Sequence, residues 1–98
     1  MKMRTKDYES LDIDNALAMN IYEVRNPDGS LDWCHLDARI PYEHPEWGYR
    51  LGIYTFGRFS SVENANKFID RLMKARDSEN PPEVFDAEEE NAIVEGKI

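Results

Sequence analysis

The sequence lacks most of the features that identify an enzyme, a membrane protein or a disulfide-bonded scaffold. Its 98 residues include one cysteine, Cys34, which cannot form a disulfide within the chain. The start, MKMRTKDYES, has basic residues but no following apolar stretch, and no apolar run approaches the roughly 20 residues that cross a bilayer. We therefore expect a cytoplasmic protein with one core and no membrane partner.

Basic residues are also scarce, with 12 Lys and Arg against 20 Asp and Glu and a net charge of −8. The imbalance is greatest at the end of the chain, where residues 77–98 carry eight acids and one base. Acidic surfaces repel phosphate backbones, so direct nucleic-acid binding is disfavoured and a protein with a basic surface is the more fitting partner. A smaller acidic cluster near the start comprises Asp7, Glu9, Asp12 and Asp14.

No pattern of catalytic, cofactor-binding or metal-binding residues stands out. The glycines Gly48, Gly52 and Gly57 flank or interrupt an expected strand and form no phosphate-binding loop. Cys34 and His35 are neighbours, but neighbouring side chains on a strand point to opposite faces and could not ligate one ion. We expect a buried cysteine, a surface histidine, and a non-enzymatic protein without cofactor or metal.

Three segments have the alternation of antiparallel strands, namely residues 17–25, 31–40 and 49–59. The first two are joined by NPDG at 26–29, which combines the residues that favour a tight turn. The Pro-bounded stretch PYEHPEWG predicts a loop before the third strand. One face of the second strand is apolar and consists of Cys34, Leu36, Ala38 and Ile40. Part of the first strand, within residues 10–20, fits a helix equally well, and this alternative stays open.

A helix over residues 60–76 is the clearest element. SSVE at 60–63 has the spacing of a capping box, in which Ser60 caps the first turn and Glu63 reaches back. The apolar positions then follow one stripe: Val62, Ala65, Phe68, Ile69, Leu72 and Met73. Acid-before-base pairs at i,i+4 join Glu63 with Lys67 and Asp70 with Lys74. The pattern predicts an α+β fold, a three-stranded antiparallel sheet with one amphipathic helix packed on one face.

The predicted domain covers residues 1–80, followed by an acidic C-terminal segment, 81–98, that docks in part through its apolar residues. If the helix covers the side of the third strand that carries Leu51 and Ile53, an aromatic set lies on the opposite face. This set comprises Tyr22, Trp33, Tyr54 and Phe56. The terminal segments either fold over these rings or leave them to bind a partner or a second copy of the chain.

The acids of the C-terminal segment admit two interpretations. They form a solvated end, or Asp86, Glu88, Glu89 and Glu90 imitate phosphates and occupy a basic groove on a partner protein. The small size, acidity, sheet-plus-helix core and lack of catalytic motifs resemble small phage-encoded inhibitors of bacterial defence, such as anti-CRISPR proteins. This resemblance implies an inhibitor that occupies the nucleic-acid-binding surface of a CRISPR-Cas or other host defence protein.

Two further interpretations accompany the inhibitor hypothesis. The order of LDWCHLDARI and GRFSSVENANKFID is similar to the three-strand-plus-helix layout of AP2-type DNA-binding domains, although the basic strand with which those domains read DNA is not matched. The alternative function is a small homo-oligomeric module of unknown cellular role that associates through the aromatic face.

Overall fold

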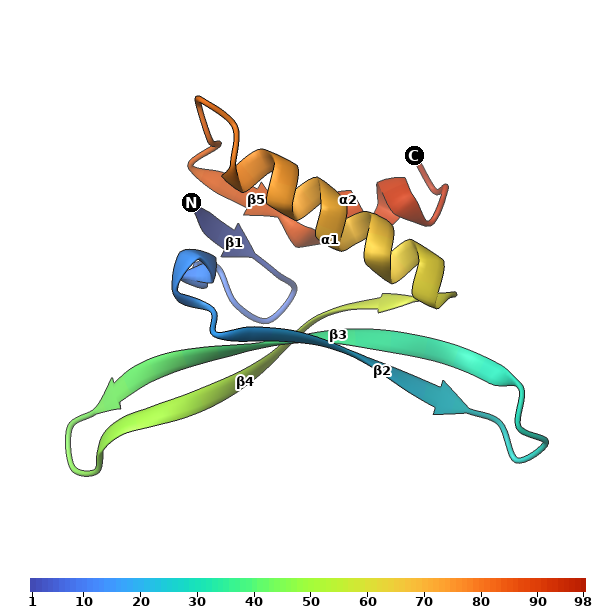
Figure 1. Cartoon of the computed structure of the whole chain (residues 1–98), viewed down its shortest axis with the longest axis horizontal. Coiled ribbons are helices and arrows are strands. Elements are labelled where there is room, and N and C mark those ends of the chain that lie inside the picture. Colours follow the sequence, from blue (N-terminus) through green and yellow to red (C-terminus); the bar gives the residue numbers. More distant parts are fainter.

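The computed structural model describes all 98 residues, Met1–Ile98, and centres on a three-stranded antiparallel sheet in the order β2-β3-β4. The strands run over Ala18–Arg25, Leu31–His44 and Gly48–Phe59. On one side of this sheet lie two helices, α1 (Val62–Arg76) and α2 (Ala87–Val94), and a parallel pair of short strands, β1 (Lys2–Arg4) and β5 (Val84–Asp86) (Figure 1). The predicted α+β class and antiparallel sheet are confirmed, whereas α2 and the parallel pair go beyond the prediction.

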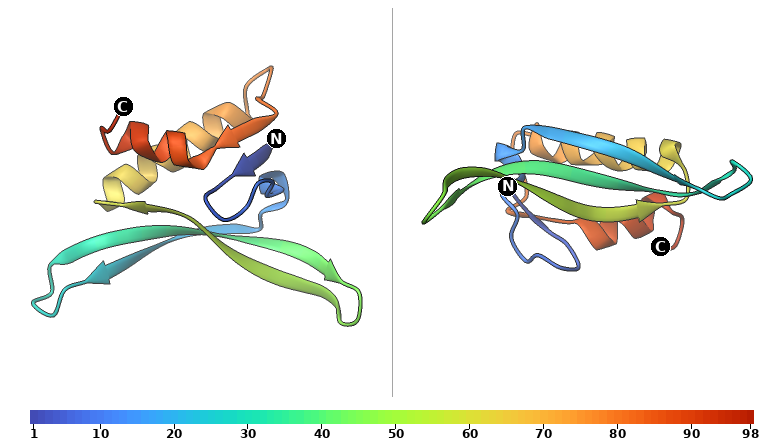
Figure 2. Two further views of the ribbon diagram at one scale, coloured as in Figure 1. Left: turned by 180° about the vertical axis from the view of Figure 1, so that it is seen from behind. Right: turned by 90° about the horizontal axis from the view of Figure 1, so that it is seen from below.

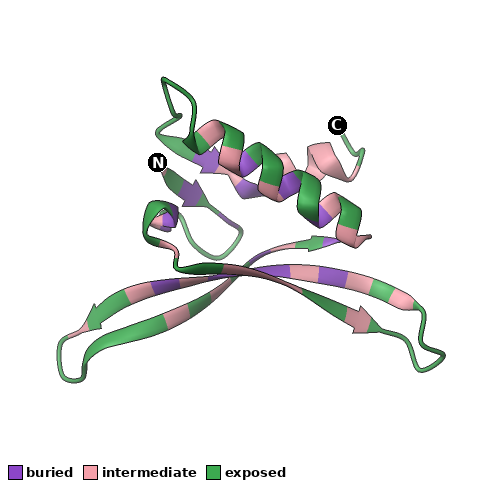
Figure 3. Cartoon of the chain, viewed as in Figure 1, coloured by how far each residue is buried: buried purple, intermediate pink, exposed green.

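A single hydrophobic core lies between the sheet and these elements (Figure 3). The 14 buried apolar residues are Met3, Leu11, Ile13, Cys34, Leu36, Ala38, Ile40, Phe56, Phe59, Ala65, Phe68, Leu72, Phe85 and Ala87. The predicted apolar face of β3 is confirmed, because its four residues all belong to this core. The opposite face of the sheet has no element over it (Figure 2, right).

The β3–β4 hairpin is longer than the sequence predicts. Its ladder continues to the pair His44 and Gly48, so most of the predicted loop at 41–48 is strand. Arg39 directs its C=O toward β2, and by alternation the backbone nitrogen of Pro41 faces the same side. The ladder with β2 ends at Arg39, opposite Ala18, so no strand lies beside Pro41 and the N–H that proline lacks costs no ladder hydrogen bond. The result is an arm that extends beyond the helical layer (Figure 1).

The faces of β4 differ from the prediction, because Tyr54 lies opposite the core residue Ala38 and Ile53 lies opposite the outward residue Arg39. The register shifts between Leu36 and Asp37 of β3, so that Phe56 is an extra residue opposite them and turns into the core. Tyr54 also lies on the helix side, where its ring meets that of Tyr8 edge-on. The expectation that Tyr54 and Phe56 share a face with Tyr22 and Trp33 is therefore wrong.

Helix α1 packs as predicted, but its cap lies one residue later. Ala65, Phe68 and Leu72 are buried, and the Phe68 ring contacts the rings of Phe56 and Phe59. The N-cap is Ser61, whose Oγ accepts from Asn64 N at 3.1 Å. The predicted capping box at Ser60 is wrong because Ser60 hydrogen-bonds to Glu95 of the C-terminal segment instead. The Glu63–Lys67 pair forms, at 3.5 Å, whereas Asp70 and Lys74 form no ion pair.

The C-terminal segment is built into the same core. Strand β5 pairs with β1 in the register Met3 opposite Phe85, and the Phe85 ring packs edge-on against Phe68. Helix α2 begins at Asp86, whose carboxylate accepts from the backbone N–H groups of Glu88 and Glu89. Residues 84–94 are therefore part of the same folded unit as residues 1–80, which the sequence predicts as the domain.

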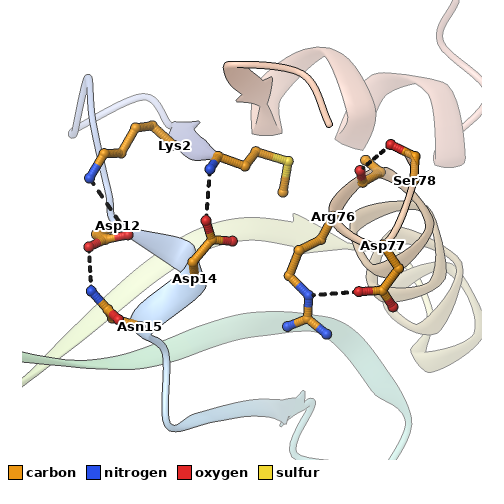
Figure 4. A network of polar contacts seen from close by, with 9 residues as sticks. Lys2, Asp12, Asp14, Asn15, Arg76, Asp77 and Ser78 are labelled. Atoms are coloured by element: carbon orange, nitrogen blue, oxygen red, sulfur yellow. Dashed lines mark hydrogen bonds and ion pairs between the residues drawn. The ribbon is translucent and has the colours of Figure 1, made fainter. Parts of the chain in front are cut away.

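The N-terminal segment contains only one short 3-10 turn, η1 (Ile13–Asn15), before β2 begins. The strand alternative for residues 18–20 is therefore correct. Figure 4 shows how this segment is held: Lys2 Nζ lies 3.6 Å from Asp12, and the amine of Met1 lies 2.7 Å from Asp14. Two of the four acids in the N-terminal cluster are consequently paired within the chain.

Candidate protein-binding surfaces

The uncovered face of the sheet, called the outer face below, is formed by the side chains that alternate with core residues along the strands. The two ladders place on it Asn20, Tyr22 and Val24 from β2, Trp33, His35, Asp37, Arg39, Pro41 and Glu43 from β3, and Tyr49, Leu51, Ile53, Thr55 and Arg58 from β4. Four large apolar members are strongly exposed, at 40% for Tyr22, 77% for Tyr49, 47% for Leu51 and 56% for Ile53.

At the β2 end, the aromatic side chains of the outer face hold one another in place. The Arg58 guanidinium lies over the Trp33 ring, 4.1 Å from its centroid. The His35 ring meets both Trp33 and Tyr22 edge-on, at centroid distances of 5.4 and 5.3 Å. Arg39 donates to the Tyr22 hydroxyl at 3.3 Å. These contacts order the rings before any partner binds, which lowers the entropic cost of binding.

The centre of the outer face is polar, and its carboxylate has a hydrogen-bond partner within the chain. Asp37 is nearly buried there and accepts from the Thr55 hydroxyl at 2.8 Å, with His35 Nδ1 at 3.8 Å from the same carboxylate oxygen. The only other acid on the face is Glu43, toward the arm. The outer face therefore carries two arginines and little exposed acid, in contrast to the strongly acidic chain as a whole.

At the arm end, the outer face is aliphatic and its tip is ordered. Leu51 and Ile53 follow one another along β4, and beyond them the Trp47 ring stacks on His44 at 4.2 Å. His44 Nδ1 accepts from the backbone N–H groups of Glu46 and Trp47, at 3.1 and 3.3 Å, which fixes the turn. Trp47 is nevertheless 61% exposed.

The structure separates the predicted aromatic site. Tyr22 and Trp33 lie on the outer face, whereas Tyr54 leans on the core and Phe56 is buried within it. The sequence missed Leu51 and Ile53, which it assigned to the helix side, and Tyr49, which precedes them on the same face. Their alternation gave the right grouping, but only the pairing with β3 reveals which side that group faces.

The four predicted acids of the C-terminal segment have different environments. Asp86 pairs with Arg4 in addition to capping α2, and the hydrogen bond from Arg4 lowers the pKa of Asp86. Glu90 pairs with Arg71. Glu88 and Glu89 have no ion-pair partner. Only these two remain free to meet a basic surface.

Cys34 and His35, the neighbouring residues considered for metal and nucleophile chemistry, lie in different environments. Cys34 is buried, its Sγ lies 3.6 Å from the Phe59 carbonyl oxygen, and burial raises the pKa of the thiol. His35 lies on the opposite face, as the alternation predicts. No group of three or more His, Cys, Asp or Glu side chains is arranged to hold a metal ion.

Neither helix is long and apolar enough to span a membrane. Comparison of this chain with models of protein families, with curated proteins and with solved structures finds no match.

Proposed function

We propose that this protein is a non-enzymatic protein-binding module and that its contact surface is the outer face of the sheet. The observation that carries the proposal is the exposure of Tyr22, Tyr49, Leu51 and Ile53 on one uncovered face. An antiparallel sheet with one solvated face ordinarily alternates apolar inward and polar outward residues. Here the outward positions are rich in aromatic and aliphatic side chains, a composition typical of an interface.

The charges on the outer face indicate what the partner offers. Arg39 and Arg58 lie among the aromatic rings, and neither forms an ion pair with an acid of this chain. A partner surface that combines apolar side chains with a few carboxylates complements this arrangement. The arginines then contribute to specificity and association rate, and the apolar contacts supply most of the affinity.

Affinity purification with matched variants tests the proposal. The double variant Tyr22→Ser/Val24→Ser removes apolar area at the β2 end of the outer face, whereas Val84→Ser removes exposed apolar area on β5, on the helix side. We expect wild type and Val84→Ser to retain the same partners and the double variant to lose them, with all three folded by thermal melting. Partners held equally by the double variant would overturn the outer face as the contact surface.

The inhibitor hypothesis drawn from the sequence is the second candidate function. It is favoured by Glu88 and Glu89, which are adjacent, unpaired and at the first turn of α2. In this alternative the acidic side of the molecule occupies a basic nucleic-acid-binding surface of a host protein. It predicts binding that weakens with salt and competes with nucleic acid, which binding through apolar contacts does not.

A further inference from the structure

Strand β4 has a free edge that lacks the usual protection against pairing. It is the last strand in the order β2-β3-β4, so one of its edges meets no other strand. Natural edge strands are blunted by proline, lysine, inward charges, bulges or shortness, and the bulge of β4 lies at Phe56, outside residues 49–55. The 12 residues of β4 contain no proline, lysine, aspartate or glutamate, and their only charges are Arg50 and Arg58.

The free part of this edge can be located residue by residue. Arg39 directs its C=O toward β2, and by alternation the backbone N–H and C=O of Asp37 also point toward β2. Asp37 and its partner Thr55 therefore form a pair without mutual hydrogen bonds, and the backbone groups of Thr55 point away from β3 toward the free edge. The same holds for Ile53, Leu51 and Tyr49. At the other end of β4, the outward carbonyl of Arg58 accepts from Asn91 of α2 at 2.7 Å, which closes that end.

We propose that the edge from Tyr49 to Thr55 pairs with the same edge of a second copy, antiparallel, with the two-fold axis at Gly52. In this register Leu51 of each copy lies opposite the partner's Ile53. The aliphatic side chains therefore pack against each other across the contact between the two β4 strands, which is called the seam below. Tyr49 then lies opposite the partner's Thr55. The two sheets become one, because the outward hydrogen-bonding groups of each β4 satisfy those of the other.

The helix side of the seam is compatible with the same register. Gly52 faces Gly52 of the partner subunit, so residue 52 itself places no side chain at the axis. Gly52 cannot carry a side chain even within one copy, since an added Cβ would lie 2.6 Å from the Tyr54 ring. Arg50, whose guanidinium bonds only to the Tyr49 carbonyl, lies opposite the partner's Tyr54 and can stack on that ring.

The register also brings the hairpin tip of one copy to a groove on the other. A groove of about 790 Å³ lies beside β4, between Thr55–Arg58, the N-terminal loop at Thr5–Asp7 and α2. In Figure 2, right, this loop and α2 project beyond the edge of β4, while the arm extends clear of them. The proposed pairing directs the arm of the partner, with the exposed Trp47 near its tip, along β4 toward this groove.

Charge complementarity supports a second copy as the occupant. The groove carries Lys6, Asp7, Glu88 and Lys97, none of which forms an ion pair within the chain. The tip of the arm carries Glu46, which likewise has no ion-pair partner and is opposite in charge to Lys6 and Lys97 of the groove. This inference does not depend on the proposed function, because edge pairing leaves the outer face of both copies uncovered and side by side.

Light scattering on the purified chain across a dilution series tests the proposal. We expect wild type to show twice the 11.5 kDa chain mass at high concentration and single chains on dilution. Ile53→Lys and Leu51→Glu should each remain monomeric, because each places a charge at the seam. Tyr22→Lys, on the outer face at the far strand, should dimerise like wild type. Wild type that stays monomeric, or dimers lost equally in Tyr22→Lys, would overturn the edge contact.

Mixing the two monomeric variants tests the register itself. In the mixture the Leu51→Glu carboxylate of one chain lies opposite the Ile53→Lys ammonium of the other, so a heterodimer should form although neither variant dimerises alone. Amide exchange on wild type gives an independent readout: the N–H groups of Leu51, Ile53 and Thr55 should be protected at high concentration and exchange rapidly on dilution. Failure to form the heterodimer, or exchange that is independent of concentration, would contradict the proposed pairing.

Discussion

The guanidinium of Arg58 lies over the indole of Trp33, 4.1 Å from the ring centroid, and joins the edge strand β4 to the central strand β3 on the outer face. The contact shields one side of Trp33 from water although the sheet face is uncovered. It also keeps a positive charge among the aromatic residues that we propose as a contact surface.

Removing this cation should expose the indole. We expect Arg58→Ala to lower the free energy of unfolding by about 0.5–1 kcal/mol, the usual value of an exposed cation–π pair. In a Trp47→Phe background, where Trp33 is the only tryptophan, iodide should quench fluorescence more strongly. Arg50→Ala is the matched control, because Arg50 contacts no indole. Unchanged quenching would show that the contact does not persist in solution.

Phe68 is the centre of the aromatic core. Its ring is fully buried and contacts the rings of Phe56, Phe59 and Phe85, which come from the sheet and from β5. Phe68→Ala should therefore destabilise the protein by about 3–5 kcal/mol, as measured by urea unfolding. Tyr49→Ala, at a strongly exposed position, should change stability by less than about 0.5 kcal/mol in the monomer. Equal effects of the two changes would contradict the observed packing of α1 on the sheet.

Glu95 should make stability depend on pH in the acid range. Partial burial on its own raises the pKa of Glu95, but hydrogen bonds from Ser60 and Asn64, at 2.6–2.7 Å, outweigh it and hold the pKa below its ordinary value of 4.5. Because the folded pKa is the lower one, this stabilisation is complete above the unfolded value and is lost as pH falls through the folded value.

The measurement is a series of unfolding midpoints between neutral pH and the acid range. Glu95→Gln should reduce stability at neutral pH and flatten the decline below the ordinary glutamate pKa. Glu79→Gln, which changes an exposed acid without a hydrogen-bond partner, is the control and should follow wild type. A Glu95→Gln profile parallel to wild type would mean that ionisation of Glu95 does not contribute to the pH dependence of stability.

The sequence predicts those elements in which the apolar residues lie on only one face. The stripe of α1 and the apolar face of β3 each bury a single set of positions, so period alone identifies them. Strand β4 has apolar residues at both odd and even positions, with Leu51 and Ile53 on one face and Tyr54 and Phe56 on the other. The choice between them depends on the pairing with β3, which places Tyr54 opposite the core residue Ala38 and Ile53 opposite the outward residue Arg39.

The C-terminal segment was hard to predict for a different reason. Strands β1 and β5 have three residues each and pair across almost the whole chain, so no local periodicity reveals them. The cap of α1 depends on the same segment, because Glu95 binds Ser60 and leaves Ser61 to cap. For the candidate surfaces, the sequence identifies Tyr22 and Trp33 and the unpaired acids Glu88 and Glu89, but the fold decides which residues join them.

The four acids at the start of α2 should separate into two that stabilise the fold and two that are free. Asp86→Ala removes the N-cap of α2 and the partner of Arg4, and should cost about 0.5–2 kcal/mol on the usual scale for a lost cap. Asp86→Asn is the matched control, because it keeps a capping side chain and loses the ion pair. Glu88→Gln/Glu89→Gln should leave the unfolding free energy within about 0.5 kcal/mol of wild type, since neither acid has an ion-pair partner.

This separation permits a clean test of phosphate mimicry. Replacing all four acids would weaken the fold and the binding together, whereas Glu88→Gln/Glu89→Gln alters charge alone. If the acidic side of the molecule occupies a nucleic-acid-binding surface, the double variant should compete less well with DNA for that partner, and the wild-type advantage should shrink as salt rises because exposed charges are screened. Competition that is equal for both proteins at low and high salt would leave Glu88 and Glu89 as a solvated helix start and the outer face as the candidate contact.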